Sequence, residues 1–153
     1  MYFDPRPKNR KEDFFNREKE LEQFEEVLSY ASIIVVTGLR RTGKTSFVDV
    51  ALSKTNHPYA FLDMRDLPVV PSRAEIIRRV ETAFGKMDKK WLSPLSEALK
   101  HVKGVDFAGA SITFHWGEKG VDLTELFDKT DAWAKKRNEH FLFAIDEVQL
   151  IRG

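Results

Sequence analysis

The stretch that decides the fold runs Gly38-Leu39-Arg40-Arg41-Thr42-Gly43-Lys44-Thr45, and its pattern is GxxxxGK(S/T). Two glycines at this spacing allow a compact loop whose successive backbone N–H groups point inward, toward an anion. A helix that follows the loop adds the positive end of its dipole at the same place. The pattern therefore predicts a phosphate-binding loop, or P-loop, placed between a strand and a helix.

The loop and the residue after it make up the expected nucleotide site. The pattern places the Lys44 ammonium on the β- and γ-phosphates and the Thr45 hydroxyl on Mg²⁺. The alternative is a glycine-rich turn with an exposed lysine, but the pattern arises by chance in only about half a percent of chains this long. The residues expected to bind the phosphates are Gly38, Leu39, Arg40, Arg41, Thr42, Gly43, Lys44, Thr45 and Ser46.

A pair of acidic residues, Asp146-Glu147, follows the apolar run 141–145, which is the setting of a Walker B motif. An aspartate at the carboxyl end of a parallel strand faces the phosphates and can hold Mg²⁺ through water. The adjacent glutamate can accept a proton from the attacking water. We therefore expect Thr45 and Asp146 at the metal, and Lys44 and Glu147 as the catalytic residues. The alternative is a surface strand end with Asp146 capping a following helix.

Apolar periodicity predicts alternating helices and strands around these motifs. Residues 32–37, 58–63 and 141–145 are β-branched or apolar on both faces and predict buried strands of a parallel sheet. A helix over 44–54 joins the first two strands into a right-handed βαβ unit. Amphipathic spacing predicts further helices at 16–30, 71–84, 91–102 and 121–138, and alternation about Gly109 predicts a β-hairpin within 104–117.

These elements predict the α/β fold of a P-loop NTPase, with three αβα layers, a mainly parallel sheet and the β-hairpin as an insertion. The chain has 153 residues, which fits one domain, here residues 14–153 after an N-terminal arm at 1–13. The hydrophobic share of 42% and the charged share of 32% exclude a disordered chain.

Composition also limits the cofactors and partners. No apolar run approaches the ~20 residues of a membrane helix, and the N-terminus has no apolar signal region, so we expect a cytoplasmic protein without a membrane partner. The absence of cysteine excludes disulfides, thiol catalysis and cysteine zinc sites, and the histidines have no metal-ligand spacing. A net charge of +1 does not indicate nucleic-acid binding, although a local patch leaves it open.

Four stretches together resemble a known family. FFNREKE at 14–20 resembles the hhGRExE motif of the signal-transduction ATPases (STAND), a branch related to AAA+, with Asn16 in place of the usual glycine. The other three are GLRRTGKTS at 38–46, FLDMR at 61–65 and AIDEVQ at 144–149. Over about residues 3–150 the chain resembles the N-terminal part of an archaeal-type ATPase domain.

The resemblance implies ATP as the nucleotide and Mg²⁺ as the metal. It also implies that Arg17 lies near the base or ribose, whereas the residues alone favour an ion pair with Glu20 or Glu25 on a helix face. For Arg65, at the end of the second strand, a structural ion pair is the favoured interpretation. Hydrolysis in the complete protein would switch a conformation or an assembly, with a protein partner or a homo-oligomer as the receiver.

In related ATPases, a strand that follows Walker B in sequence lies between the P-loop strand and the Walker B strand. An arginine finger and a helical lid come later still. We therefore expect this chain to be the N-terminal part of the domain. Without the later strand a gap would separate 32–37 from 141–146, so either other residues fill it or the strands pair in another way. Two other functions remain open: a DNA-associated ATPase of the origin-recognition type, and a nucleotide-binding switch without turnover.

Overall fold

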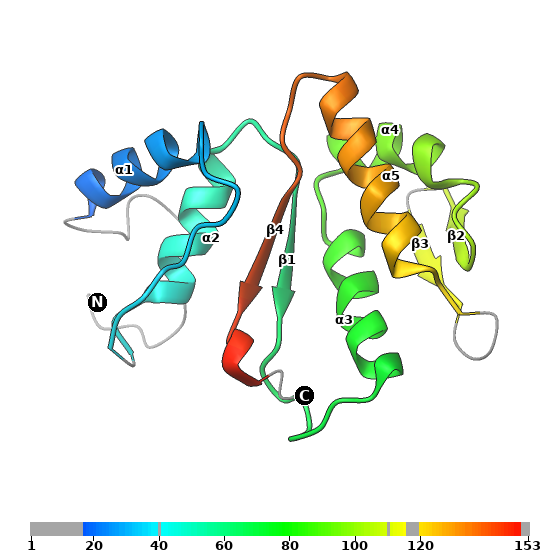
Figure 1. Cartoon of the computed structure of the whole chain (residues 1–153), viewed down its shortest axis with the longest axis horizontal. Helices are drawn as coiled ribbons and strands as arrows, with labels where there is room; N and C mark the ends of the chain where they lie inside the picture. Colours follow the sequence, from blue (N-terminus) through cyan, green and yellow to red (C-terminus); the bar gives the residue numbers. More distant parts are fainter. Residues whose placement is uncertain (1–16, 40, 110, 116–119, 151–153) are drawn as a thin grey trace. The chain divides into compact units, whose positions relative to one another are not determined.

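The computed structural model describes residues 17–39, 41–109, 111–115 and 120–150 (Figure 1). The chain divides into two compact units, Met1–Asn56 and His57–Gly153. The expected arm at 1–13, the predicted N-cap Asn16 and the loop residue Arg40 lie outside the described residues.

Two helices form the first unit. Helix α1 spans Glu18–Leu28, with Arg17 at its N-cap, and helix α2 spans Lys44–Lys54, with Gly43 at its N-cap. The rings of Phe24 and Phe47 meet edge to face, with their centroids 6.0 Å apart. The apolar faces of the two helices therefore pack on each other, as their sequence periodicity predicts. The buried residues of this small core are Leu21, Phe47, Val50 and Ala51.

The predicted strand at 32–37 is wrong, because the structure gives these residues no strand. Ile33 and Val35 are 82% and 76% exposed, and only Val36 packs against the core of the first unit. A strand exists through hydrogen bonds to a neighbouring strand, and no strand within the described residues pairs with this segment. The βαβ unit predicted to start here is therefore not formed as such, although its helix α2 is.

A parallel pair of strands forms a two-stranded sheet in the second unit (Figure 1). Strand β1 spans Tyr59–Asp63 and strand β4 spans Leu142–Asp146, in a register that runs from Tyr59↔Leu142 to Asp63↔Asp146. The pairing continues one residue further, since Met64 N donates to Asp146 O at 3.2 Å. Two runs far apart in sequence thus end at the same edge, as the expected α/β fold with parallel strands requires.

The remaining elements of the second unit follow the sequence prediction closely. Helices α3, α4 and α5 span Arg73–Gly85, Lys89–Leu99 and Leu123–Lys136, with Ser72, Asp88 and Asp122 as their N-caps. Each of these side chains accepts a hydrogen bond from a backbone N–H of the first turn, which fixes the helix start. The hairpin is confirmed as strands β2 (Val105–Ala108) and β3 (Ser111–Phe114), and a short 3-10 helix, η2, spans Val148–Leu150.

One hydrophobic core holds the second unit together. Phe84 of α3 is fully buried and stacks on Phe141, with the ring centroids 5.7 Å apart. Helix α3 packs on β1 and β3, while α4 packs on α5. Other core side chains with no exposed surface are Leu95, Leu99, Phe114 and Leu126. None of the described helices has the length and apolar character needed for a bilayer crossing.

Candidate functional site

The phosphate loop folds at the start of α2. Gly43 adopts a φ of +78° and a ψ of +25°, a left-handed conformation that glycine accepts without strain. Helix α2 begins at the next residue, Lys44, so the first turn of the helix, the positive end of its dipole, lies directly after the loop. Thr45 and the buried Ser46 occupy this first turn. The loop is therefore followed directly by a helix N-terminus, as the pattern predicts, and anion binding at this place stays a prediction.

The Lys44 side chain turns back over the loop. Its ammonium donates to the carbonyl oxygens of Gly38 at 3.1 Å and Leu39 at 2.8 Å. The Thr42 hydroxyl donates to the same Leu39 oxygen, also at 2.8 Å. The loop therefore holds its positive charge above its own backbone, where a phosphate oxygen can replace the weaker carbonyl acceptors.

Arg17 joins this loop from a distant part of the chain. Its Nη2 donates to Thr42 O at 2.6 Å, across 25 positions of sequence. This contact differs from the ion pair with Glu20 or Glu25 that the residues alone favour. A guanidinium at the loop backbone adds positive charge beside the place expected for the phosphates. A direct contact between Arg17 and a base or ribose stays a prediction.

The acidic pair lies at the carboxyl edge of β4, in the second unit. Asp146 is the last residue of the strand, and its Oδ1 accepts the backbone N–H of Glu147 at 3.1 Å. Glu147 has a φ of +56°, which is unusual for a residue with a side chain, and its carboxylate accepts a hydrogen bond from the Gln149 amide. The sharp turn ends the strand and projects the two carboxylates in succession.

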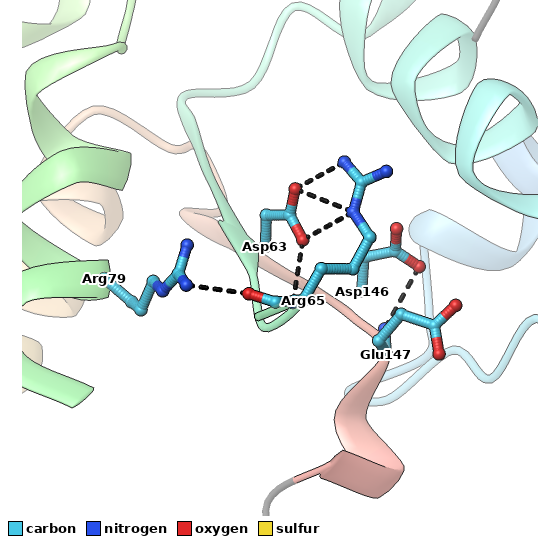
Figure 2. A network of polar contacts seen from close by, with 5 residues as sticks. All are labelled: Asp63, Arg65, Arg79, Asp146 and Glu147. Atoms are coloured by element: carbon cyan, nitrogen blue, oxygen red, sulfur yellow. Dashed lines mark hydrogen bonds and ion pairs between the residues drawn. The ribbon is translucent and has the colours of Figure 1, made fainter. Parts of the chain in front are cut away.

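An ion pair on β1 lies next to this acidic pair (Figure 2). Arg65 Nε donates to both carboxylate oxygens of Asp63, at 2.9 and 3.0 Å, and its Nη2 donates to Oδ2 at 2.5 Å. Arg79 of α3 donates to the Arg65 carbonyl oxygen at 2.7 Å. The Arg65 hydrogen bonds hold the pKa of the Asp63 carboxyl below its usual value, while the same bonds raise the pKa of Arg65.

Sequence reasoning favoured the ion pair of Arg65 but did not include Asp63 among the site residues. The signal was present, because FLDMR follows a predicted strand and parallel strands end at one edge. What was missing was the register that makes Asp63 and Asp146 direct partners. The predicted site residues thus fall into two groups, with Arg17 and the loop in the first unit and the acidic pair in the second.

Each of the two groups contains an oxygen ligand of the kind that magnesium prefers, and a shared metal site stays a prediction. A threonine hydroxyl at a helix N-terminus and an aspartate carboxylate at a strand end are hard ligands, and Mg²⁺ completes its coordination with phosphate oxygens and water. No group of three or more His, Cys, Asp and Glu side chains arranged to hold a metal occurs among the described residues.

Comparison with solved structures finds a similarity to a known protein. The structure is similar to the Walker-type ATPase PABY2304 of Pyrococcus abyssi, with a TM-score of 0.69 and 26% sequence identity. The match covers 98% of this chain and 40% of that protein, so the chain spans less than half of its length. No family model and no curated protein sequence matches the chain. The chain is an α/β protein with parallel strands and a β-hairpin, similar to part of a Walker-type ATPase.

Proposed function

We propose that the chain binds Mg²⁺-ATP and that the complete protein hydrolyses it to drive a regulatory or conformational switch. The single observation that carries the proposal is the phosphate loop itself. Within the GxxxxGK(S/T) stretch, Gly43 is left-handed directly before α2 begins. The Lys44 ammonium folds back onto the carbonyl oxygens of the loop. The similarity to part of a Walker-type ATPase supports the same function.

Each polar residue of the two groups has a role in this proposal. The loop N–H groups and the start of α2 hold the phosphates, and Lys44 leaves its carbonyl acceptors to stabilise the charge that develops on the transferred phosphoryl group. Arg17 keeps the loop backbone in place through Thr42. Bound Mg²⁺ would supply Lewis-acid stabilisation of the phosphate oxygens, held by Thr45 and Asp146.

Glu147 is the proposed general base. Its carboxylate follows Asp146 directly at the carboxyl edge of β4, where the ligands of parallel sheets bind. There it would orient the attacking water and take its proton during in-line attack on the γ-phosphate. The present hydrogen bond from Gln149 would have to open or be shared for this step.

A thermal-unfolding titration with Mg²⁺-ATP tests the binding step. Ligand at 100 times its Kd adds about 2.7 kcal/mol to the free energy of unfolding, which raises the melting temperature by several degrees. We expect Lys44→Ala to abolish this rise. Lys54→Ala is the matched control, because Lys54 is an exposed lysine in the last turn of the same helix. An equal rise for the wild type and Lys44→Ala would contradict the P-loop assignment.

Turnover is tested separately by phosphate release from a chain that includes the rest of the ATPase. Glu147→Gln keeps the size of the side chain and removes the base, so we expect binding to persist and hydrolysis to stop. Binding with no hydrolysis in the wild type as well would instead favour a nucleotide switch without turnover.

A further inference from the structure

Two carboxylates and one guanidinium lie near one another at the carboxyl edge of the β1–β4 pair. Asp63 and Asp146 are register partners, so their side chains leave the same face of the sheet from strands about 4.8 Å apart. Arg65 lies in the turn that follows β1, and its guanidinium folds back onto the Asp63 carboxylate. Figure 2 shows the three side chains together at this edge.

In the structure, the Arg65 guanidinium is paired with the Asp63 carboxylate. All the hydrogen bonds that it gives to the Arg65 guanidinium within the described residues go to the Asp63 carboxylate. The backbone N–H of Arg65 also donates to Asp63 Oδ1, at 3.0 Å, so one carboxylate holds both the main chain and the side chain of this residue. Arg79 fixes the Arg65 carbonyl from the other side, at 2.7 Å.

Asp146 is a second carboxylate near Arg65 (Figure 2). Its charge is among those that raise the pKa of Arg65, after the hydrogen bonds and charge of Asp63. A guanidinium pairs strongly with any carboxylate that accepts two of its N–H groups. Half of the Arg65 side-chain surface is exposed, so the side chain has room to change partner.

We propose that Asp63 is a positioning residue that holds Arg65 away from Asp146, so that the guanidinium does not compete with Mg²⁺ for the Asp146 carboxylate. The proposal assigns the two strand ends different tasks. β4 supplies the carboxylate for the metal, and β1 supplies the carboxylate that neutralises the nearby arginine. The part that concerns Mg²⁺ rests on the proposed function, whereas the choice of partner by Arg65 does not.

The first experiment follows the partner of Arg65 by NMR of the arginine Nε–H groups in the full chain, with Arg65→Lys used to assign the resonance. In the wild type, the Arg65 Nε–H exchanges slowly because Asp63 accepts it. In Asp63→Asn we expect slow exchange to persist, because Asp146 takes over as the acceptor. In Asp63→Asn with Asp146→Asn we expect fast exchange. Fast exchange already in the single variant would overturn the proposal.

The second experiment measures the affinity for Mg²⁺ as the increase in nucleotide binding when Mg²⁺ is added. Asp63→Asn should weaken the Mg²⁺ affinity about tenfold, the lower end of what supporting residues of metal sites contribute. Nucleotide binding without Mg²⁺ should not change. Adding Arg65→Gln to Asp63→Asn should restore the Mg²⁺ affinity, because the competing guanidinium is then gone.

The double variant and one control separate positioning from a structural effect. Asp131→Asn removes a carboxylate from an exposed ion pair with Lys135 on α5 and should change nothing. A double variant as weak as Asp63→Asn would overturn the proposal, because Asp63 would then act on the metal or the fold directly. A wild type without any Mg²⁺-dependent nucleotide binding would refute the proposed function, while the Nε–H exchange would still decide which partner Arg65 selects.

Discussion

Gly104, at the start of the hairpin, shows how strongly one atom can constrain the fold. Its φ is +77°, and a Cβ built there would lie 2.7 Å from both Cα and N of Val121, which precedes α5. Gly109, in the turn of the hairpin, has a similar φ of +62° but nothing within 4 Å of the corresponding Cβ position. A comparison of substitutions at the two glycines therefore separates the effect of backbone strain from that of a steric clash.

We expect Gly104→Ala to destabilise the second unit by about 3 kcal/mol, from left-handed strain and the clash with Val121 together. Gly109→Ala should cost about 1 kcal/mol, from left-handed strain alone. Urea denaturation of both variants measures the difference. Equal losses of unfolding free energy would show that Val121 moves aside without cost.

At the same scale, the sequence alone predicts the local geometry of the loop but not the contacts made to it from elsewhere in the chain. Gly43 and Lys44 were predictable because the loop pattern is local, so spacing alone carries the geometry. The contact of Arg17 was not predictable from the residues, because its acceptor is a carbonyl oxygen of Thr42, 25 positions away. A sequence does not show which backbone oxygen accepts a hydrogen bond, whereas it does show the acidic residues Glu20 and Glu25. An ion pair is therefore the better interpretation of Arg17 from the sequence alone.

Among the elements, helix α3 has the most complete start signal. The Ser72 hydroxyl accepts the backbone N–H of Glu75, and the Glu75 carboxylate accepts the backbone N–H of Ser72 at 2.7 Å. This reciprocal capping box satisfies two N–H groups that the helix itself cannot pair. The hydrogen bonds from Ser72 hold the pKa of the Glu75 carboxyl below its usual value.

The capping box leads to a prediction on pH dependence. Because the pKa of Glu75 is lower in the folded state, its contribution to stability is complete above the ordinary carboxyl pKa and is lost as the pH falls through the lowered one. Ser72→Ala should return the Glu75 pKa toward its usual value, measured by carboxyl ¹³C NMR. Ser96→Ala, which removes a hydroxyl bonded within α4, should leave the Glu75 pKa unchanged.

Strands differ from helices in how far the sequence can specify them. Helices α3 and α5 form where periodicity and capping residues predict them, since their backbone hydrogen bonds are made within the helix or to nearby capping side chains. The segment 32–37 consists mainly of β-branched residues, which favour a strand, yet it has no strand partner within the described residues. A high strand propensity means that the side chains suit the face of a sheet, but a strand forms only where a neighbouring strand pairs with it.

For the whole molecule, the division into two units implies two separate cores. The core of the first unit is small and centres on Phe47 between α1 and α2, while that of the second contains Phe84 and most of the buried apolar side chains. The parallel register that joins β1 to β4 depends on the second core alone. This register cannot be predicted from either strand by itself. The pairing of Asp63 with Asp146 depends on the register and therefore cannot be predicted either.

We expect the two cores to respond differently to truncation. Phe84→Ala should reduce the unfolding free energy of the second unit by about 4 kcal/mol. Phe47→Ala should instead speed hydrogen exchange of the amides in α1 and α2. The amides of α3 and α5 should keep their protection in Phe47→Ala. Loss of protection throughout the chain in that variant would show that the two units unfold as one.

The turn at Glu147 has a consequence for how this chain tolerates change. A residue with a side chain costs about 1–2 kcal/mol in left-handed backbone, and glycine would avoid most of that cost. The amide of residue 147 would still reach Asp146 Oδ1 with glycine in place. Selection for folding alone would therefore favour glycine at this position. Under the proposed function, the carboxylate needed for hydrolysis would outweigh that preference, a trade-off between stability and activity confined to one residue.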